Sequence, residues 1–93
     1  TSAWANDRVS VDNFTYQSEI AKLVLKLDNS NGRAIERMTV SCAFLDKGGR
    51  AVDVVLAMFR DINRGEIAYD TAAAVLPERP DSVACRVKRL REK

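Results

Sequence analysis

The 93-residue sequence predicts an antiparallel β-sandwich of six to seven strands, in which two sheets pack face to face. Short segments alternate apolar with polar residues, turn residues separate them about every 8–14 residues, and helical periodicity is almost absent. Each predicted strand has one apolar face, so two sheets must close on one another to bury these faces. The length fits one domain over residues 1–93, with a small core.

The first two predicted strands cover residues 8–16 and 20–29 and follow a loose N-terminus at residues 1–7. The alternation in the first strand is interrupted at Asp12 and Asn13, so we expect an irregularity there. The second strand places four apolar side chains on one face, namely Ala21, Leu23, Leu25 and Leu27. It ends in a segment of turn-forming residues, Asp28-Asn29-Ser30-Asn31-Gly32.

The strand predicted at residues 35–46 is the centre of the fold. One of its faces is apolar and carries Met38, Val40, Cys42 and Phe44. The other face is smaller and only mildly polar, with Thr39, Ser41, Ala43 and Leu45. A hairpin turn follows at Asp46-Lys47-Gly48-Gly49, where glycine supplies left-handed backbone. These glycines do not have the spacing of a phosphate-binding P-loop.

Three further strands are predicted at residues 51–60, 66–76 and 82–90. A break in the alternation at Asp53 indicates a bulge or an edge position in the first of them. Three consecutive alanines, Ala72 to Ala74, leave a helical turn open as an alternative in the second. The two prolines of the segment 77–81 predict a loop, and residues 91–93 are expected to form a basic tail.

A resemblance to a bacterial family rests on a polar turn at Asn29-Ser30-Asn31, the segment Cys42-Ala43-Phe44-Leu45-Asp46, Gly49 and Val52, and a second turn at Ile62-Asn63-Arg64-Gly65-Glu66. This order resembles the FxLYD-type domains, although only Asp46 matches the signature letter for letter and Cys42 replaces its first aromatic residue. The resemblance covers about residues 20–90. It implies an immunoglobulin-like sandwich in an exported or envelope protein, without a general activity or a functional residue.

The two cysteines, Cys42 and Cys85, both point inward by the parity of their strands. The resemblance implies that the third strand pairs with the strand near the C-terminus, which would allow a disulfide within one sheet. If the strands lie in different sheets, the bridge would cross the core. A disulfide between these cysteines would close a loop of about 43 residues and stabilise the fold by about 4 kcal/mol. The alternative is two free, buried thiols.

The C-terminal end is basic, whereas the rest of the chain is nearly neutral. The last eight residues contain one acid, Glu92, and five bases: Arg86, Lys88, Arg89, Arg91 and Lys93. Arg86 and Lys88 share an outward face by parity. These residues suggest, as an alternative function, the binding of nucleic acid or another polyanion through the last strand. No aromatic residue interleaves with them for base stacking, so nucleic acid is the weaker expectation.

No catalytic or metal motif is present in the sequence. The chain has no histidine, the carboxylates Asp46, Asp53, Asp61 and Asp70 are spaced like turn and outward residues, and two cysteines are too few for a zinc site. We therefore expect a non-enzymatic module without cofactor or metal. Its expected partner is a protein, recognised by strand-edge pairing, and a homodimer remains open.

The expected location is periplasmic or extracellular. The sequence begins at Thr1 without an initiator methionine or leader, as a mature chain does after signal removal, although a shortened version of the protein would look the same. The longest apolar run, Val54 to Phe59, is far shorter than the roughly 20 residues of a spanning helix, so no membrane span is expected.

Overall fold

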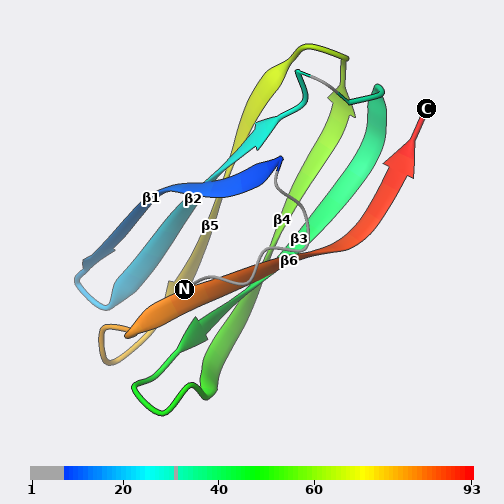
Figure 1. The fold of residues 1–93 in the computed structure, drawn as a ribbon. Coiled ribbons are helices and arrows are strands. Elements are labelled where there is room, and N and C mark those ends of the chain that lie inside the picture. The colour runs from blue at the N-terminus through cyan, green and yellow to red at the C-terminus, as the bar shows by residue number, and fades with distance from the viewer. Residues whose placement is uncertain (1–7, 31) are drawn as a thin grey trace.

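The computed structural model describes residues 8–30 and 32–93 and confirms an all-β sandwich of two antiparallel three-stranded sheets (Figure 1). One sheet has the order β1-β2-β5 and the other the order β4-β3-β6. The six strands are β1 (Val9–Gln17), β2 (Ile20–Asp28), β3 (Ile35–Leu45), β4 (Ala51–Ile62), β5 (Ile67–Val75) and β6 (Ser82–Glu92). Residues 1–7, predicted to be loose, and Asn31 in the predicted turn lie outside the described residues.

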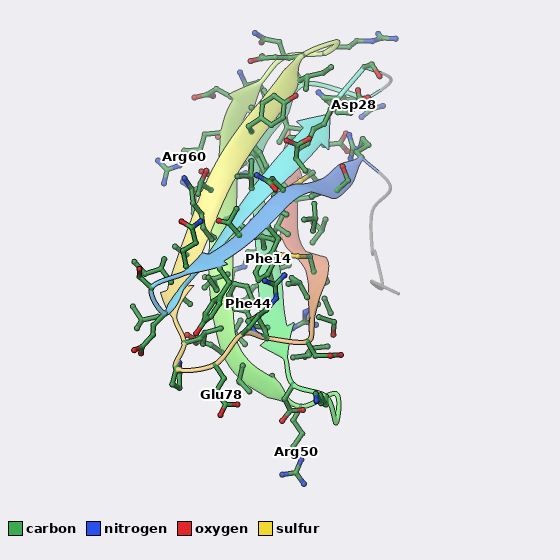
Figure 2. The ribbon with its side chains drawn as sticks, turned by 90° about the vertical axis from the view of Figure 1, so that its left-hand side faces the viewer. Phe14, Asp28, Phe44, Arg50, Arg60 and Glu78 are labelled. Atoms are coloured by element: carbon green, nitrogen blue, oxygen red, sulfur yellow. A yellow bond between two sulfur atoms is a disulfide. The ribbon has the colours of Figure 1, made fainter. Side chains whose placement is uncertain are left out.

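The core forms between the inner faces of the two sheets. The ring centroids of Phe14 on β1 and Phe44 on β3 lie 6.1 Å apart, and Figure 2 shows both rings between the sheets. The predicted apolar faces of β2 and β3 are fully buried. The residues concerned are Ala21, Leu23, Leu25, Leu27, Met38, Val40, Cys42 and Phe44. Period-2 alternation therefore identified the buried face of both central strands.

The predicted irregularities in β1 and β4 are present. The register of β1 against β2 shifts between Val11 and Asn13, and that of β3 against β4 shifts next to Asp53. At the second shift β4 contributes one extra residue, and β4 is an edge strand of its sheet. Residues 66–76 contain a strand, β5, and the helical alternative at its alanines is not adopted.

The middle strand β3 is hydrogen-bonded to β4 on one side and to β6 on the other. Cys42 and Cys85 are directly opposite in the β3–β6 register and form a disulfide, with Cα atoms 4.0 Å apart. Both residues are buried. The bridge therefore lies within one sheet, as expected if the third strand pairs with the last strand, and it does not cross the core.

One end of the sandwich is joined through Asn29, whose side chain is fully buried. Its amide oxygen accepts a hydrogen bond from Arg8 Nη1 (3.0 Å), and its Nδ2 donates to the carbonyl oxygens of Arg33 (3.0 Å) and Asn63 (3.1 Å). A single side chain thus connects the start of β1, the β2–β3 loop and the β4–β5 turn. Figure 1 shows these connections at the same end of the molecule.

The opposite end contains the predicted hairpin turn between β3 and β4. The Asp46 carboxylate accepts hydrogen bonds from the main-chain N–H groups of Gly48 (2.9 Å) and Arg50 (3.0 Å). Gly49 has a φ of 80°, so a glycine occupies the left-handed position of the turn, as expected. The turn is therefore closed by an acidic side chain as well as by glycine.

Candidate interaction surface

The face of the β4-β3-β6 sheet that points away from β1-β2-β5, called the outer face here, combines apolar and basic side chains. Strand pairing arranges twelve of its residues in four rows across the sheet, each row taking one residue from β4, one from β3 and one from β6. In order they are Val54–Ala43–Ala84, Leu56–Ser41–Arg86, Met58–Thr39–Arg89 and Arg60–Arg37–Arg91. The composition of each strand's column determines what the face can bind.

The β4 column is apolar and exposed. Val54, Leu56 and Met58 are 53%, 56% and 40% exposed, whereas Val55 is partly buried and Ala57 and Phe59 are buried against the core. Alternate residues of β4 point to opposite faces of the sheet. The residues that face the core and those that face outward are both apolar along this part of the strand. Arg60 Nε donates to Met58 Sδ (3.1 Å), and Figure 2 shows Arg60 projecting away from the sandwich. Contiguous exposed apolar side chains on a folded domain mark contact surfaces.

The middle column, on β3, has small side chains at Ala43, Ser41 and Thr39. Two shallow hollows lie along it and the neighbouring strand β6. One has a volume of about 240 Å³ and is lined by Ser41, Ala43, Ala84, Cys85 and Arg86. The other has a volume of about 360 Å³ and is lined by Arg37, Arg89, Leu90 and Arg91. Both hollows are therefore lined by residues of β3 and β6, and neither by a residue of β4.

The β6 column is basic because of a bulge that the sequence did not reveal. Val87 pairs with Val40, but Arg89 pairs with Thr39, so Lys88 is an extra residue in β6. The expected parity would have put Arg86 and Lys88 together on the outer face. Instead, the bulge brings Arg89 and Arg91 into the same column as Arg86. It also places Leu90 opposite Met38, on the core side of the sheet.

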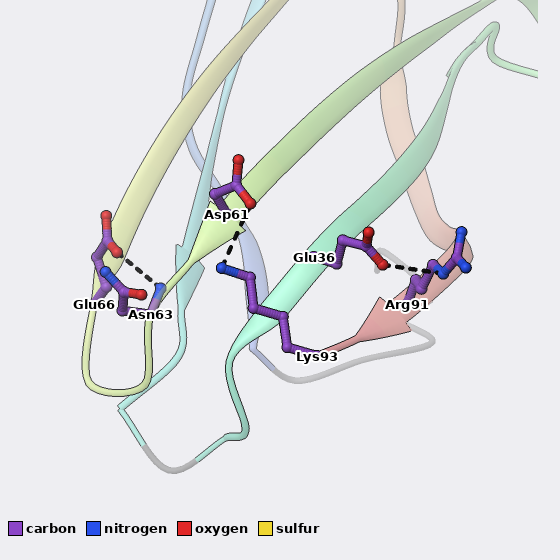
Figure 3. Close-up of polar contacts among 6 residues, drawn as sticks. All are labelled: Glu36, Asp61, Asn63, Glu66, Arg91 and Lys93. Atoms are coloured by element: carbon purple, nitrogen blue, oxygen red, sulfur yellow. Dashed lines mark hydrogen bonds and ion pairs between the residues drawn. The ribbon is translucent and has the colours of Figure 1, made fainter.

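The end of β6 is part of the sheet, because this strand continues to Glu92 where a tail had been expected from residue 91. Arg91 Nε lies 3.0 Å from Glu36 Oε2 on β3, and Lys93 Nζ lies 3.5 Å from Asp61 Oδ1 on β4 (Figure 3). Of the five predicted basic residues, three thus lie on the outer face, Lys88 occupies the bulge, and Lys93 reaches across to β4.

Much of the positive charge on the outer face is uncompensated. The four rows contain five arginines and no acidic residue. Within residues 8–30 and 32–93, the two ion pairs are those of Arg91 and Lys93, and neither involves Arg37, Arg86 or Arg89. Arg37, Arg86 and Arg89 therefore contribute no ion pair to the fold within these residues.

The free edge of β4 is occupied by carboxylates. Asp70 on β5 accepts a hydrogen bond from the main-chain N–H of Met58 (2.9 Å), and Asp53 accepts one from that of Val54 (2.8 Å). Asp70 has the inward parity of β5, together with Ala68, Ala72 and Ala74, which are small enough to let β5 approach β4. Strand edges blocked in this way are poor templates for pairing with another strand.

No cluster of three or more potential metal ligands occurs among the described residues. The pKa of the Asp28 carboxyl lies below its ordinary value because the Ser30 side chain and main-chain N–H donate hydrogen bonds to it, with a smaller contribution from Lys26. This aspartate is on the β1-β2-β5 sheet, away from the outer face. No helix within residues 8–30 and 32–93 is long and apolar enough to cross a membrane.

Sequence reasoning identified the basic strand but missed the apolar column and the arginines Arg37 and Arg60. A signal for the apolar column was present in residues 51–60, where both sets of alternate residues are apolar. An edge strand needs only one apolar face to pack on the core, so the second apolar face indicated a contact surface. Comparisons with known proteins add no further site: no family model, curated protein or solved structure matches the chain.

Proposed function

We propose that this chain is a non-enzymatic interaction module of an exported or cell-envelope protein and that it binds a partner protein through the outer face. The observation that carries the proposal is the joining of an exposed apolar column on β4 with three arginines, Arg37, Arg86 and Arg89, that form no ion pair within residues 8–30 and 32–93. Arginine beside apolar side chains is typical of the centres of protein interfaces.

A periplasmic or extracellular location is supported by the disulfide between Cys42 and Cys85. Such bonds persist in oxidising compartments and are rare in the cytosol. The resemblance to FxLYD-type domains implies the same location. Trapping the thiols of the protein in its native cells, followed by intact mass measurement, tests this part of the proposal. Recovery of the chain with both cysteines alkylated would contradict it.

Recognition through the face is better supported than the strand-edge pairing expected from the sequence. At the edge of β4, two main-chain N–H groups already have carboxylate acceptors. At the edge strand β6, the extra residue Lys88 interrupts the regular ladder and adds a charge. Bulges and lysines are devices by which proteins prevent strand addition. The outer face has no comparable obstruction.

Site-specific photo-crosslinking in the producing cells tests the interaction itself. A photoreactive side chain at position 56 replaces Leu56 on the outer face, and a matched probe replaces the exposed Thr71 on the outward side of β5. We expect a discrete protein adduct from position 56 that is absent from position 71. Equal labelling from both positions, or none from position 56, would contradict binding through the outer face.

A second function, binding of nucleic acid or another polyanion, is favoured by the clustering of Arg37, Arg86, Arg89 and Arg91. The exposed apolar column next to them has no role in that function. A gel-shift titration with labelled DNA and a heparin-column elution, both at several salt concentrations, test it. Phosphate binding predicts an affinity that falls steeply with salt.

A further inference from the structure

We propose that the partner segment on the outer face is an acidic amphipathic α-helix, lying along β3 between the apolar column of β4 and the arginines of β6. This inference rests on the proposed function and specifies the chemistry of the partner. Its apolar side would contact Val54, Leu56 and Met58. Its acidic side would contact Arg86 and Arg89, and the row Arg60–Arg37–Arg91 would close one end.

The width of the site fits a helix. The columns of β4 and β6 are separated by two strand spacings, about 9.6 Å, which is close to the roughly 10 Å diameter of an α-helix with its side chains. The column between them has small side chains at Ala43, Ser41 and Thr39, and a shallow hollow is lined by Ser41, Ala43 and Ala84, so the backbone of a helix can approach the sheet there. An extended strand would leave one of the two outer columns without a contact.

The spacing along the strands fits as well. Successive rows of the outer face are two residues apart on β3, a rise of about 6.8 Å in an antiparallel strand. One helical turn between residues i and i+4 rises about 6 Å. Acidic residues at i, i+4 and i+8 can therefore each meet one arginine of the β6 column. The four rows span about 20 Å, which is the length of roughly 14 helical residues.

The charges exclude a second copy of this chain as the occupant. A two-fold symmetric dimer brings the same surface patch of each subunit together. The outer face has five arginines and no acidic residue in its rows, so such a dimer would oppose like charges across the interface. A partner with carboxylates next to leucine-like side chains matches both columns, whereas a polyanion matches only one of them.

The test uses the full chain and two synthetic helical peptides of about 15 residues with identical composition. In the first, a glutamate stripe lies beside a leucine stripe; in the second, the two stripes lie on opposite sides. We expect saturable binding of the first peptide, with NMR amide shifts confined to the four rows of the outer face. We expect the second peptide to bind about tenfold more weakly, a loss of about 1.4 kcal/mol.

Two substitutions separate the columns. Leu56→Glu and Arg89→Glu should each weaken the first peptide about tenfold, because one removes an apolar contact and the other reverses a charge. Lys22→Glu, a matched charge reversal at an exposed position of β2, should leave binding unchanged. A peptide with lysine in place of glutamate should bind Arg89→Glu better than the unsubstituted chain. All three positions are exposed, and thermal unfolding verifies the fold of each variant.

The inference is overturned if the two peptides bind equally, if the amide shifts spread over both sheets, or if Lys22→Glu weakens binding as much as Arg89→Glu. It is also overturned if anionic phospholipid vesicles or DNA bind through Leu56 and Arg89 while neither peptide does. The photo-crosslinking experiment distinguishes the two levels of the proposal. An adduct from position 56 without peptide binding rejects the acidic helix and keeps the interaction surface, whereas no adduct rejects the surface.

Discussion

Cys42 and Cys85 face each other across the neighbouring antiparallel strands β3 and β6, with their Cα atoms 4.0 Å apart and their sulfurs joined within the core. The bridge links residues that are 43 positions apart in the sequence. It therefore closes a loop that contains the hairpin, β4 and β5, and it attaches the last strand to the centre of its sheet. The consequence is a constraint on the unfolded chain as well as on the folded one.

Breaking the bridge should lower the free energy of unfolding by about 4 kcal/mol in the chain-entropy model. This is a large part of the roughly 5–10 kcal/mol expected for a small domain. Urea unfolding of the oxidised and the fully reduced chain measures the difference without changing a side chain. Intact mass should rise by two hydrogen atoms on reduction. Coincident unfolding curves for the two forms would contradict the predicted contribution.

Replacing Asn29 by alanine should destabilise the fold by about 3 kcal/mol, since it removes three hydrogen bonds of a fully buried side chain, to the carbonyl oxygens of Arg33 and Asn63 and from the Arg8 guanidinium. Chemical denaturation measures the change. Asn63→Ala is a matched control, because Asn63 takes part through its main-chain carbonyl and its side chain is exposed. A loss as large in Asn63→Ala as in Asn29→Ala would contradict a specific role of the buried amide.

The pKa of Asp28 should move back toward its ordinary value of 3.8 when Ser30 is replaced by alanine, because the largest cause of its lowering is the Ser30 side-chain hydrogen bond. A lowered pKa in the folded state means that the stabilisation is present above the unfolded-state pKa and is lost as the pH falls through the folded-state pKa. Carboxyl ¹³C titration of both proteins gives the comparison. An unchanged pKa in Ser30→Ala would contradict the assignment.

The positions of the strands could be predicted because alternation and turn residues are local signals. In β2 and β3 one parity is clearly apolar, so the buried face was evident as well. In β4 both parities are apolar, and in β5 the larger side chains point outward while alanines face inward. In these two strands, the set of alternate residues that is buried depends on the register of β4 with β3 and of β5 with β2. It also depends on the close approach of β5 to β4. Neither is a local property of the sequence.

The candidate surface could be predicted only in part for a related reason. The basic residues of β6 were visible as a run of charges, but the bulge at Lys88 decides which of them share a face. Arg37 and Arg60 reach this surface from strands distant in sequence. Their contribution follows from the strand order β4-β3-β6 and its register, which the resemblance implied only at the level of strand neighbours.

The β1–β2 turn offers a stabilising substitution. Ser18 and Glu19 have φ angles of 51° and 63°, the left-handed region that favours glycine or asparagine in two-residue hairpins. Ser18→Asn with Glu19→Gly should raise the stability by about 1 kcal/mol, or the midpoint of thermal unfolding by about 4–8 °C. Calorimetry measures the shift. Lys47→Gly, in a turn position without positive φ, is the control and should give no increase.

Removing the Asp70 carboxylate should make the chain self-associate through β4. In the folded domain this carboxylate accepts the main-chain N–H of Met58, so Asp70→Ala frees a donor on an edge strand with an exposed apolar column. Sedimentation velocity over a range of concentrations should show more association than in the unsubstituted chain. Asp70→Asn, which keeps an acceptor oxygen, should resemble the unsubstituted chain.

Addition of Leu56→Lys to Asp70→Ala should reverse this association, because a lysine on the same edge strand places like charges together when two β4 strands pair. Association that persists in the double variant would assign the contact to another edge of the sandwich. An Asp70→Ala variant with unchanged sedimentation would show that the remaining features of the β4 edge, including the Asp53 carboxylate on Val54, are sufficient to prevent pairing.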